Sequence, residues 1–354
     1  MKILIVANGF VRAGVSRVLS LTSQAWQAEH QVDVSFFKKS DSVFPIGGKI
    51  VQENIPFQKS VWSQVYHLNK IIKKGNYDRI YGFSEDANYP LAIAAKLAGV
   101  SNKTVLTVHN PVEKFSPKVV RRVQKYYSSV YKVIAVSNGV RKGLISLGVD
   151  SGKVIFRPNP IDLNMVQTKA IEPIDESRLR FGKGVNFISA GRLHPHKGFD
   201  ILIKAFQQVL IEMPDATLSI IGDGPQKSDL NYLIDELGLG KSVFLMGALE
   251  NPFPLIKAAD IYVMSSRLEG WPLVLMEAMG IGKPVISFAC PNGPDEIINN
   301  KLQGWLIEAE NQNALSQKMV ELAKQPEIWQ DMSSAAQLRM QDFELKVAGP
   351  KWIV

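Results

Sequence analysis

The sequence predicts an α/β protein built from two Rossmann-like, doubly wound domains. Short runs rich in Val and Ile alternate with longer amphipathic stretches along the chain. These runs are almost continuously apolar, which is typical of parallel strands that helices cover on both faces. Six runs, a polar break and six further runs divide the 354 residues into two halves of ordinary domain size.

The first half, residues 1–165, contains six predicted strands, at 3–8, 32–37, 80–84, 104–110, 132–137 and 154–160. Helical periodicity separates them. Between the second and third strands, Val61, Val65, Leu68 and Ile72 recur at i, i+4, i+7 and i+11, as on one face of a helix.

A polar stretch from 162 to 184 contains Pro173 and has no apolar period, so we expect a linker at 166–184. The second domain, 185–330, has six predicted strands, at 186–192, 217–224, 243–248, 261–266, 284–290 and 304–308. We expect a C-terminal helix, 331–354, to return to the first domain. Open α/β sheets bind ligands beyond the carboxyl ends of their strands, so the expected site is a cleft between the two domains.

Composition narrows the classes of function. Hydrophobic residues make up 46% and charged residues 21%, and no apolar run approaches the ~18 residues of a membrane-spanning helix. Cys290 is the only cysteine, which excludes a disulfide framework and a Cys-based metal cluster. The N-terminus is interpreted as a buried strand and not as a signal peptide, so we expect a cytoplasmic protein. A net charge of +8 suits an anionic partner.

Two cations follow the first strand of the second domain. Arg192 and Lys197 are five residues apart in a strand-to-helix loop, where they are well placed to grip a diphosphate. The alternative is a basic loop that is only solvated. Gly191 and Gly198, which flank the two cations, favour the diphosphate site over this alternative. The nearby histidines have no cysteine partner for a metal site.

Two carboxylates surround a proline in the same domain. Glu269 is predicted to lie in a loop, and Glu277 in a helix that begins at Pro272. The first-turn N–H groups of Leu273 and Val274 then form an anion site. Because a bound phosphate repels carboxylates, both glutamates are expected to bind neutral hydroxyls. A nucleotide-sugar fits this pattern better than hydrolase chemistry or a metal site.

These residues resemble a known family. The segments RLHPHKG (192–198) and EGWPLVLMEA (269–278), with AVSNGV (135–140) and PNPID (158–162), are similar to family-4 retaining glycosyltransferases of GT-B fold. The segment CPNGPDEII (290–298) also resembles the branch that builds bacterial surface polysaccharides and lipid-linked oligosaccharides.

The resemblance implies a role for each matching residue. Arg192 and Lys197 would hold the donor diphosphate, Glu277 the ribose hydroxyls and Glu269 the hydroxyls of the transferred sugar. His109, at the end of a first-domain strand, would lie near that sugar.

Backbone groups complete the implied donor site, at Gly270, Trp271, Leu273 and Val274. The chain departs from the family after the first strand, where the usual double glycine followed by Glu-Arg is replaced by RAGVSRV, 12–18. Gly14 and Arg17 remain there, so Gly14 is expected to approach phosphate or acceptor.

The implied reaction moves a hexosyl or N-acetylhexosaminyl group from a UDP-sugar to a glycan or lipid-linked acceptor, with retention of configuration. No Asp-x-Asp occurs in the chain, so we expect neither a metal nor another cofactor. The Gly-x-Gly-x-x-Gly string of a dinucleotide-dependent dehydrogenase is also missing. An epimerase of similar shape and a non-catalytic nucleotide-sugar-binding protein remain alternatives.

A basic stretch in the first domain suggests a surface partner. Between 116 and 133, tyrosines Tyr126, Tyr127 and Tyr131 are interleaved with Lys118, Arg121, Arg122, Lys125 and Lys132. This pattern favours peripheral contact with an anionic membrane, on its inner face, although a solvated basic helix face is an equal alternative. Nucleic acid is not expected, because no nucleic-acid-binding motif accompanies the charge.

Overall fold

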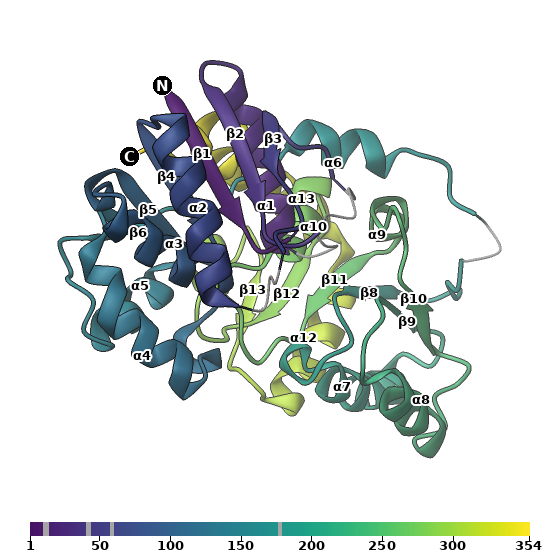
Figure 1. Ribbon diagram of the computed structural model, residues 1–354. Coiled ribbons are helices and arrows are strands. Elements are labelled where there is room, and N and C mark those ends of the chain that lie inside the picture. Colours follow the sequence, from purple (N-terminus) through teal and green to yellow (C-terminus); the bar gives the residue numbers. More distant parts are fainter. Residues whose placement is uncertain (10–13, 40–43, 57–59, 176–178) are drawn as a thin grey trace. The chain divides into compact units, whose positions relative to one another are not determined.

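The computed structural model describes residues 1–354 except 10–13, 40–43, 57–59 and 176–178. Its described residues form two compact α/β units (Figure 1). Unit 1 consists of Met1–Pro160 and Phe343–Val354, and unit 2 of Ile161–Asp342. Each unit is a parallel β-sheet whose strands are joined by helices, which confirms the predicted fold class.

The sheet of unit 1 has the strand order β3-β2-β1-β4-β5-β6-β7, and every adjacent pair is parallel. Its strands are β1 (Lys2–Ala7), β2 (Gln31–Phe36), β3 (Lys49–Gln52), β4 (Arg79–Phe83), β5 (Thr104–Val108), β6 (Lys132–Ala135) and β7 (Val154–Phe156). The six predicted strands are all present. The sequence analysis missed β3, because this edge strand is short and partly exposed and so lacks a continuous apolar run.

The helices of unit 1 are α1 (Gly14–Gln27), α2 (Val61–Gly75), α3 (Glu85–Leu97), α4 (Pro117–Tyr126), α5 (Asn138–Ser146) and α14 (Leu345–Ala348). In α2 the apolar period is confirmed, since Val65, Leu68 and Ile72 are buried. The hydroxyl of Ser60 caps its N-terminus by accepting from the backbone N–H of Ser63, and Asn76 ends it in the left-handed conformation.

The sheet of unit 2 has the order β10-β9-β8-β11-β12-β13, also parallel between neighbours. Its strands are β8 (Asn186–Ala190), β9 (Thr217–Ile221), β10 (Val243–Gly247), β11 (Ile261–Met264), β12 (Val285–Phe288) and β13 (Trp305–Ile307). All six were predicted. With β8 counted as the first strand, this is the 3-2-1-4-5-6 order of dinucleotide-binding folds.

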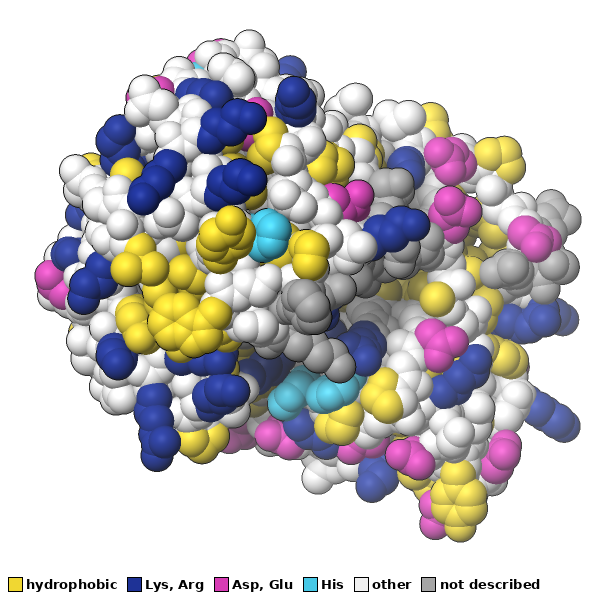
Figure 2. Space-filling model, in the orientation of Figure 1, with side chains coloured by type: hydrophobic (Ala, Val, Ile, Leu, Met, Phe, Trp, Pro, Cys, Tyr) yellow, Lys and Arg dark blue, Asp and Glu magenta, His cyan; other side chains and the backbone are white. Residues whose placement is uncertain are grey.

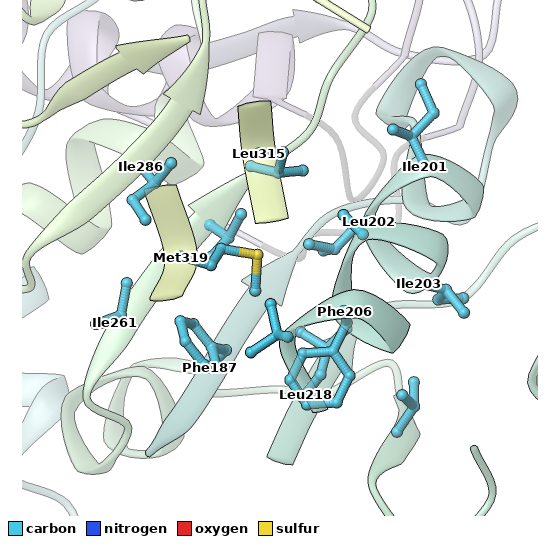
Figure 3. Packing of buried hydrophobic residues seen from close by; sticks show 14 of the residues in the cluster. Phe187, Ile201, Leu202, Ile203, Phe206, Leu218, Ile261, Ile286, Leu315 and Met319 are labelled. Carbon is cyan, nitrogen blue, oxygen red and sulfur yellow. The ribbon is translucent and has the colours of Figure 1, made fainter. Parts of the chain in front are cut away.

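The helices of unit 2 are α6 (Leu163–Ala170), α7 (Phe199–Glu212), α8 (Lys227–Glu236), α9 (Phe253–Ala258), α10 (Leu273–Ile281), α11 (Pro294–Ile297), α12 (Gln312–Ala323) and α13 (Trp329–Met340). Figure 3 shows side chains of α7 and α12 packed against those of the sheet. Phe187 of β8 and Phe206 of α7 meet edge to face, with ring centroids 6.0 Å apart. This core makes the sheet of unit 2 a rigid base for the loops at its carboxyl edge.

The predicted linker, 166–184, is wrong in its first residues. Helix α6 occupies Leu163–Ala170 and packs on α9 and α10 in unit 2. The carboxylate of Asp162 caps the helix by accepting from the backbone N–H of Met165 at 2.8 Å. Val166 and Ala170 are buried, so α6 has an apolar face. The mostly polar composition of the stretch gave no sign of this face.

The predicted C-terminal segment, 331–354, divides between the units. Helix α13 packs on α10 and belongs to unit 2, while Phe343–Val354 belongs to unit 1. Trp352 of this tail is fully buried, and its indole N–H donates to the carbonyl of Pro158 at 2.8 Å. The indole N–H of Trp26 donates in turn to Gly349 O at 3.2 Å. The tail is thus part of the core of unit 1.

Candidate functional site

The predicted donor-site residues of unit 2 follow two neighbouring strands. Lys197 follows β8 and Glu269 follows β11, and these strands pair in the middle of the sheet. The chain leaves β8 toward β9 on one side and β11 toward β12 on the other. Their carboxyl ends are therefore the switch point at which open α/β sheets bind ligands. The fold brings together two residues that are 72 positions apart in the sequence.

The loop after β8 carries the two predicted cations. Arg192 is exposed, and its side chain has no hydrogen-bond or ion-pair partner among the residues that the structure describes. Lys197 ends a 3-10 turn, Pro195–Lys197. Gly198 follows with φ +64°, and a Cβ there would lie 2.1 Å from the carbonyl oxygen of Ser265. Only glycine allows the turn to pack this closely on the end of β11.

Lys197 and Glu269 form an ion pair, with Lys197 Nζ 2.6 Å from Glu269 Oε1. The hydroxyl of Ser266 donates to the same carboxylate oxygen at 2.7 Å. Glu269 is buried, with a relative exposure of 9%. These two residues are predicted from the sequence to bind different parts of a donor, whereas in the structure they are paired with each other. A hydroxyl that bridges them would accept from the ammonium and donate to the carboxylate.

The start of α10 is open to an anion. Pro272 is the N-cap, one position before the helix, and not its first residue as predicted. The N–H groups of Leu275 and Met276 donate to Pro272 O. Those of Leu273 and Val274 have no acceptor among the described residues. These two first-turn donors and the positive end of the helix dipole form the anion site that the sequence predicts.

Gly270 and Trp271, just before α10, are both buried. The indole N–H of Trp271 points to the sulfur of Met276, one turn into the helix. The Trp271 ring is therefore a packing element that holds the loop against α10. Only its backbone is in a position to take the predicted part in ligand binding.

Glu277 lies on the second turn of α10 and is buried, with 6% exposure. Its charge acts on the phenol of Tyr262 in β11. Burial raises the pKa of Tyr262 first, and the carboxylates of Glu277 and then Glu269 raise it further. The Tyr262 hydroxyl donates to Ala190 O, at the end of β8, at 3.4 Å. Both predicted carboxylates thus lie within electrostatic reach of the switch point.

Arg267, which was not predicted from the sequence, connects the loops of the site. Its guanidinium donates to both carboxylate oxygens of Asp200, at 2.8 and 2.7 Å, to the carbonyl of Pro195 at 2.7 Å and to Glu310 at 2.9 Å. Burial favours a higher pKa for Asp200, but the Arg267 guanidinium outweighs it and holds that pKa below its ordinary value. The sequence offered one signal for this contact, the opposite charges of Asp200, in the first turn of α7, and Arg267, in the loop after the neighbouring strand β11.

His109 of unit 1 is buried directly after β5 and packs against the rings of Phe83 and Trp352, whose centroids lie 5.7 and 5.8 Å from its own and 6.0 Å from each other. Burial lowers the pKa of His109 to about 3, so the ring is neutral. Thr107 donates its hydroxyl to Gly82 O at 2.9 Å, so His109 Nε2, 2.9 Å from the same hydroxyl, must be the donor. His109 Nδ1 is then a buried acceptor with no partner among the described residues.

The other predicted residue of unit 1, Gly14, is the exposed first residue of α1. The preceding positions, Arg12 and Ala13, lie outside the described residues. Glu85 was not predicted as a site residue. It is the first residue of α3, which follows β4. Burial raises the pKa of Glu85. Its carboxylate accepts a hydrogen bond at 2.9 Å from the side-chain amide of Asn110, the residue that follows His109. Glu85 thus anchors the loop that carries His109.

The basic stretch of unit 1, 116–133, divides between a helix and a strand. Helix α4 ends at Tyr126, and Lys132 is the first residue of β6, where its ammonium donates to Gly152 O. Tyr127 is buried and belongs to the core. The interleaved pattern therefore holds for α4 only.

The surface over α4 combines cations with aromatic rings. Lys118, Arg121 and Lys125 are exposed, and the guanidinium carbon of Arg122 lies 4.0 Å from the ring centroid of Tyr89. Residues of α3 and α4, including Tyr89 and Arg122, line a shallow surface hollow of about 640 Å³. Figure 2 shows Lys and Arg side chains around hydrophobic ones on the face over α2 and α4.

Two features of the part of the chain that the structure describes bear on metal binding and on membranes. No group of three or more His, Cys, Asp or Glu side chains is arranged to hold a metal ion there. Nor does any helix within it combine the length and the apolar character needed to cross a bilayer.

Comparisons with known proteins bear on both units. Residues 171–339 match the family described as "Glycosyl transferases group 1", and residues 12–165 match "Glycosyltransferase Family 4". The two matches cover most of the chain and fall on different units, as expected for a two-domain enzyme of this kind.

Individual relatives agree with the family matches. An uncharacterized glycosyltransferase of Methanocaldococcus jannaschii is 33% identical over 69% of the chain, which spans 63% of that protein's length. An Escherichia coli UDP-Gal:α-D-GlcNAc-diphosphoundecaprenol α-1,3-galactosyltransferase is 30% identical over 84% of the chain and 81% of its own length. The crystal structure of Anabaena HepE with UDP-glucose has a TM-score of 0.84 at 22% identity, over 99% and 98% of the two chains.

Proposed function

The chain belongs to the group 1, family 4 glycosyltransferases, and on that premise we propose that it moves a hexosyl or N-acetylhexosaminyl group from a UDP-sugar to a glycan or lipid-linked acceptor. The product would retain the anomeric configuration of the donor. One observation supports the proposal most. The Lys197–Glu269 pair and the open N–H groups of α10 lie at the same switch point, so an anion and a hydroxyl can bind side by side.

Each group of this site has one task in the proposed reaction. Arg192, Lys197 and the first-turn N–H groups of α10 stabilise the charge that grows on the leaving diphosphate. Glu269 binds hydroxyls of the transferred sugar, and Glu277 binds the ribose. No residue is assigned as a covalent nucleophile. The acceptor attacks on the face that the diphosphate leaves, and a diphosphate oxygen takes the acceptor's proton.

His109 has a limited role in this scheme. A ring with a pKa of about 3 is neutral and cannot serve as an acid at neutral pH. Its Nδ1 is instead proposed to accept a hydrogen bond from a substrate hydroxyl. Neither a metal ion nor another cofactor is required, because the diphosphate charge is met by Arg192, Lys197 and the start of α10.

Two relatives support the choice of donor and acceptor. The E. coli relative is named for transfer from UDP-Gal to a lipid diphosphate, and HepE was crystallised with UDP-glucose. We therefore propose a UDP-sugar as the donor and a lipid-linked glycan of surface-polysaccharide synthesis as the acceptor class.

A lipid-linked acceptor requires access to a membrane surface, and the charge distribution supports it. Of the 41 Lys and Arg, 25 lie in unit 1 with 10 of the 33 Asp and Glu, a net charge of +15. Unit 2 has the remaining 16 and 23, a net charge of −7. On α2, Trp62 and Tyr66 are 71% and 66% exposed, and their neighbours Val61 and Gln64 line a pocket together with Arg122 of α4. We propose peripheral contact of unit 1 with an anionic, cytoplasmic membrane face.

The test incubates the protein with a panel of UDP-sugars and a lipid extract, and measures both UDP release and new glycoside. Transfer with one donor is expected, and it should persist in EDTA. Nuclear magnetic resonance of the product then reads the anomeric configuration. Interconversion of UDP-sugars without an acceptor would instead identify an epimerase. Tight UDP-sugar binding without turnover would identify a non-catalytic binding protein.

A further inference from the structure

The loop Cys290–Gly293, which joins β12 to α11, lies directly against the loop that contains Glu269. The backbone N–H of Glu269 donates to Pro291 O at 3.5 Å. A Cβ on Gly293 would lie 2.8 Å from Pro272 Cδ. Asn292 is therefore placed between two residues that both contact the Glu269–Pro272 segment.

The side chain of Asn292 is buried without a partner. Asn292 is 8% exposed, and its Nδ2 has no hydrogen-bond partner among the described residues. A buried amide donor with nothing to donate to destabilises a folded protein, so native structures rarely leave one unpaired. Such a group is explained when a bound molecule supplies the missing acceptor.

The backbone of Asn292 is a second, independent observation. Its φ is +70°, in the left-handed region that residues with a Cβ seldom occupy. Asparagine tolerates this region better than most residues, but glycine would adopt it without strain. The chain thus has a side chain at a position where the backbone alone favours glycine. Strain of this kind clusters at ligand sites.

The strand order indicates which part of a ligand this amide would meet. The neighbours in the sheet are β8, β11 and β12, in that order. The diphosphate cations Arg192 and Lys197 follow β8, and Glu269 follows β11. Asn292 follows β12, so it lies beyond Glu269 on the side away from β8. Because the proposed diphosphate site lies at β8, we expect the group attached to the diphosphate to extend to this side.

We infer that Asn292 is a specificity residue whose Nδ2 donates a hydrogen bond to an oxygen of the transferred sugar, either a hydroxyl or an acetamido carbonyl. The inference rests on the proposed function and adds a residue to its donor site. Glu269 accepts hydrogen bonds, while Asn292 Nδ2 donates one. A sugar hydroxyl that satisfies both must have one configuration, so the pair would distinguish epimeric donors.

The test compares the affinities of UDP and of the preferred UDP-sugar, measured by calorimetry on the full chain. The sugar's contribution is the ratio of the two dissociation constants. The variants are Asn292→Gly, which suits the left-handed backbone, and Asn292→Asp, which keeps the shape and removes the donor. Asn231→Asp, on the exposed face of α8, is the control for added charge.

Both Asn292 variants are expected to reduce the sugar's contribution about tenfold, the effect of losing one buried hydrogen bond. UDP itself should bind Asn292→Gly within about twofold of the unmodified chain, and Asn231→Asp should change neither constant. Equal weakening of UDP and UDP-sugar would show a structural role only and overturn the inference. An unchanged ratio would overturn it as well.

Monodeoxy donors identify the oxygen concerned. In the unmodified protein one deoxy UDP-sugar should bind about tenfold more weakly than its parent, and in Asn292→Gly the same donor should bind as well as the parent. If every deoxy donor keeps its full penalty in Asn292→Gly, the inference is wrong. Failure of the unmodified chain to bind any UDP-sugar would instead refute the proposed function.

Discussion

At the residue scale, the main result is the pairing of Lys197 with Glu269. Each neutralises the other at 2.6 Å, and Ser266 adds a hydrogen bond to the same carboxylate oxygen. The pair is largely shielded from water, so the loss of one partner would leave the other charge buried and uncompensated. Glu277 lies outside this cluster, on the second turn of α10. The two carboxylates are therefore expected to affect different steps.

Glu269→Ala is predicted to lower the turnover of the preferred donor about 100-fold or more, because the transferred sugar loses its hydroxyl acceptor. The Kd for UDP should change little, since UDP lacks that sugar.

Glu277→Ala is predicted to weaken UDP binding roughly 10- to 100-fold, because the ribose of UDP loses its hydrogen-bond acceptor. Turnover assays and calorimetry with UDP measure the two effects. Glu236→Ala, exposed on α8, is the matched control, and similar small effects of all three changes would contradict the assignment.

His109 predicts a pH dependence of stability. Its pKa is lowered from the ordinary 6.5 to about 3 by burial, so below pH 6.5 the unfolded chain binds a proton that the native state refuses. Stability is fully present above pH 6.5 and is lost as the pH falls toward 3, by up to about 1.4 kcal/mol per pH unit. Burial raises the pKa of Glu85, so this carboxyl has the opposite effect and favours the folded state as the pH falls.

The measurement compares unfolding of the unmodified chain and His109→Gln between pH 7 and pH 4. Because Glu85 is common to both proteins, the difference between the two profiles isolates His109. The unmodified chain should lose more stability than the variant on acidification. Parallel profiles would show that His109 is not held neutral by burial.

At the element scale, Arg267 joins three loops of unit 2. It binds Asp200 at the start of α7, the carbonyl of Pro195 and Glu310 beyond β13. The turn that carries Lys197 is thereby fixed to the loop that carries Glu269. Gly198 permits the close approach, and Arg267 maintains it.

Arg267→Ala is predicted to destabilise unit 2 by about 1–3 kcal/mol, because Asp200 and Pro195 O lose the hydrogen bonds from the guanidinium. It should also weaken UDP binding through the displaced Lys197 loop. Arg267→Lys keeps the charge but loses the two-point contact with Asp200, so its stability and UDP affinity should lie between those of the unmodified chain and Arg267→Ala. Thermal unfolding and calorimetry measure both effects, with Lys301→Ala as the exposed control. Unchanged UDP affinity in Arg267→Ala would rule out a positioning role.

At the scale of the whole molecule, the net charge of +8 conceals a strong asymmetry. Unit 1 carries +15 and unit 2 carries −7. Each cation near an anionic bilayer contributes about 1 kcal/mol to binding, and unit 1 presents several on α4 beside exposed aromatic rings. The two units thus differ in electrostatic character although they share one architecture.

The triple variant K118S/R121S/K125S is predicted to bind anionic vesicles roughly 100-fold more weakly than the unmodified chain, and uncharged vesicles unchanged. Cosedimentation with phosphatidylglycerol and phosphatidylcholine vesicles measures this. The control removes three exposed lysines of unit 2, with K204S/K241S/K301S. Equal loss in both triples would indicate a general charge effect and no specific surface.

The sequence by itself determined the α/β class, the two halves and the loops that carry the proposed site residues. Twelve of the thirteen strands among the described residues follow from apolar runs, which are a local property of buried parallel strands. Arg192, Lys197, Glu269 and Glu277 follow likewise from their places at strand and helix ends.

Only the tertiary structure decided which of these residues meet. The contacts Lys197–Glu269 and Arg267–Asp200 join residues 72 and 67 positions apart, and the hydrogen bonds of His109 depend on Thr107 and Gly82 together. The burial of Asn292 depends on the packing of two loops. A local pattern can place a charged residue at the end of a strand, but its partner is chosen by the order in which the strands assemble.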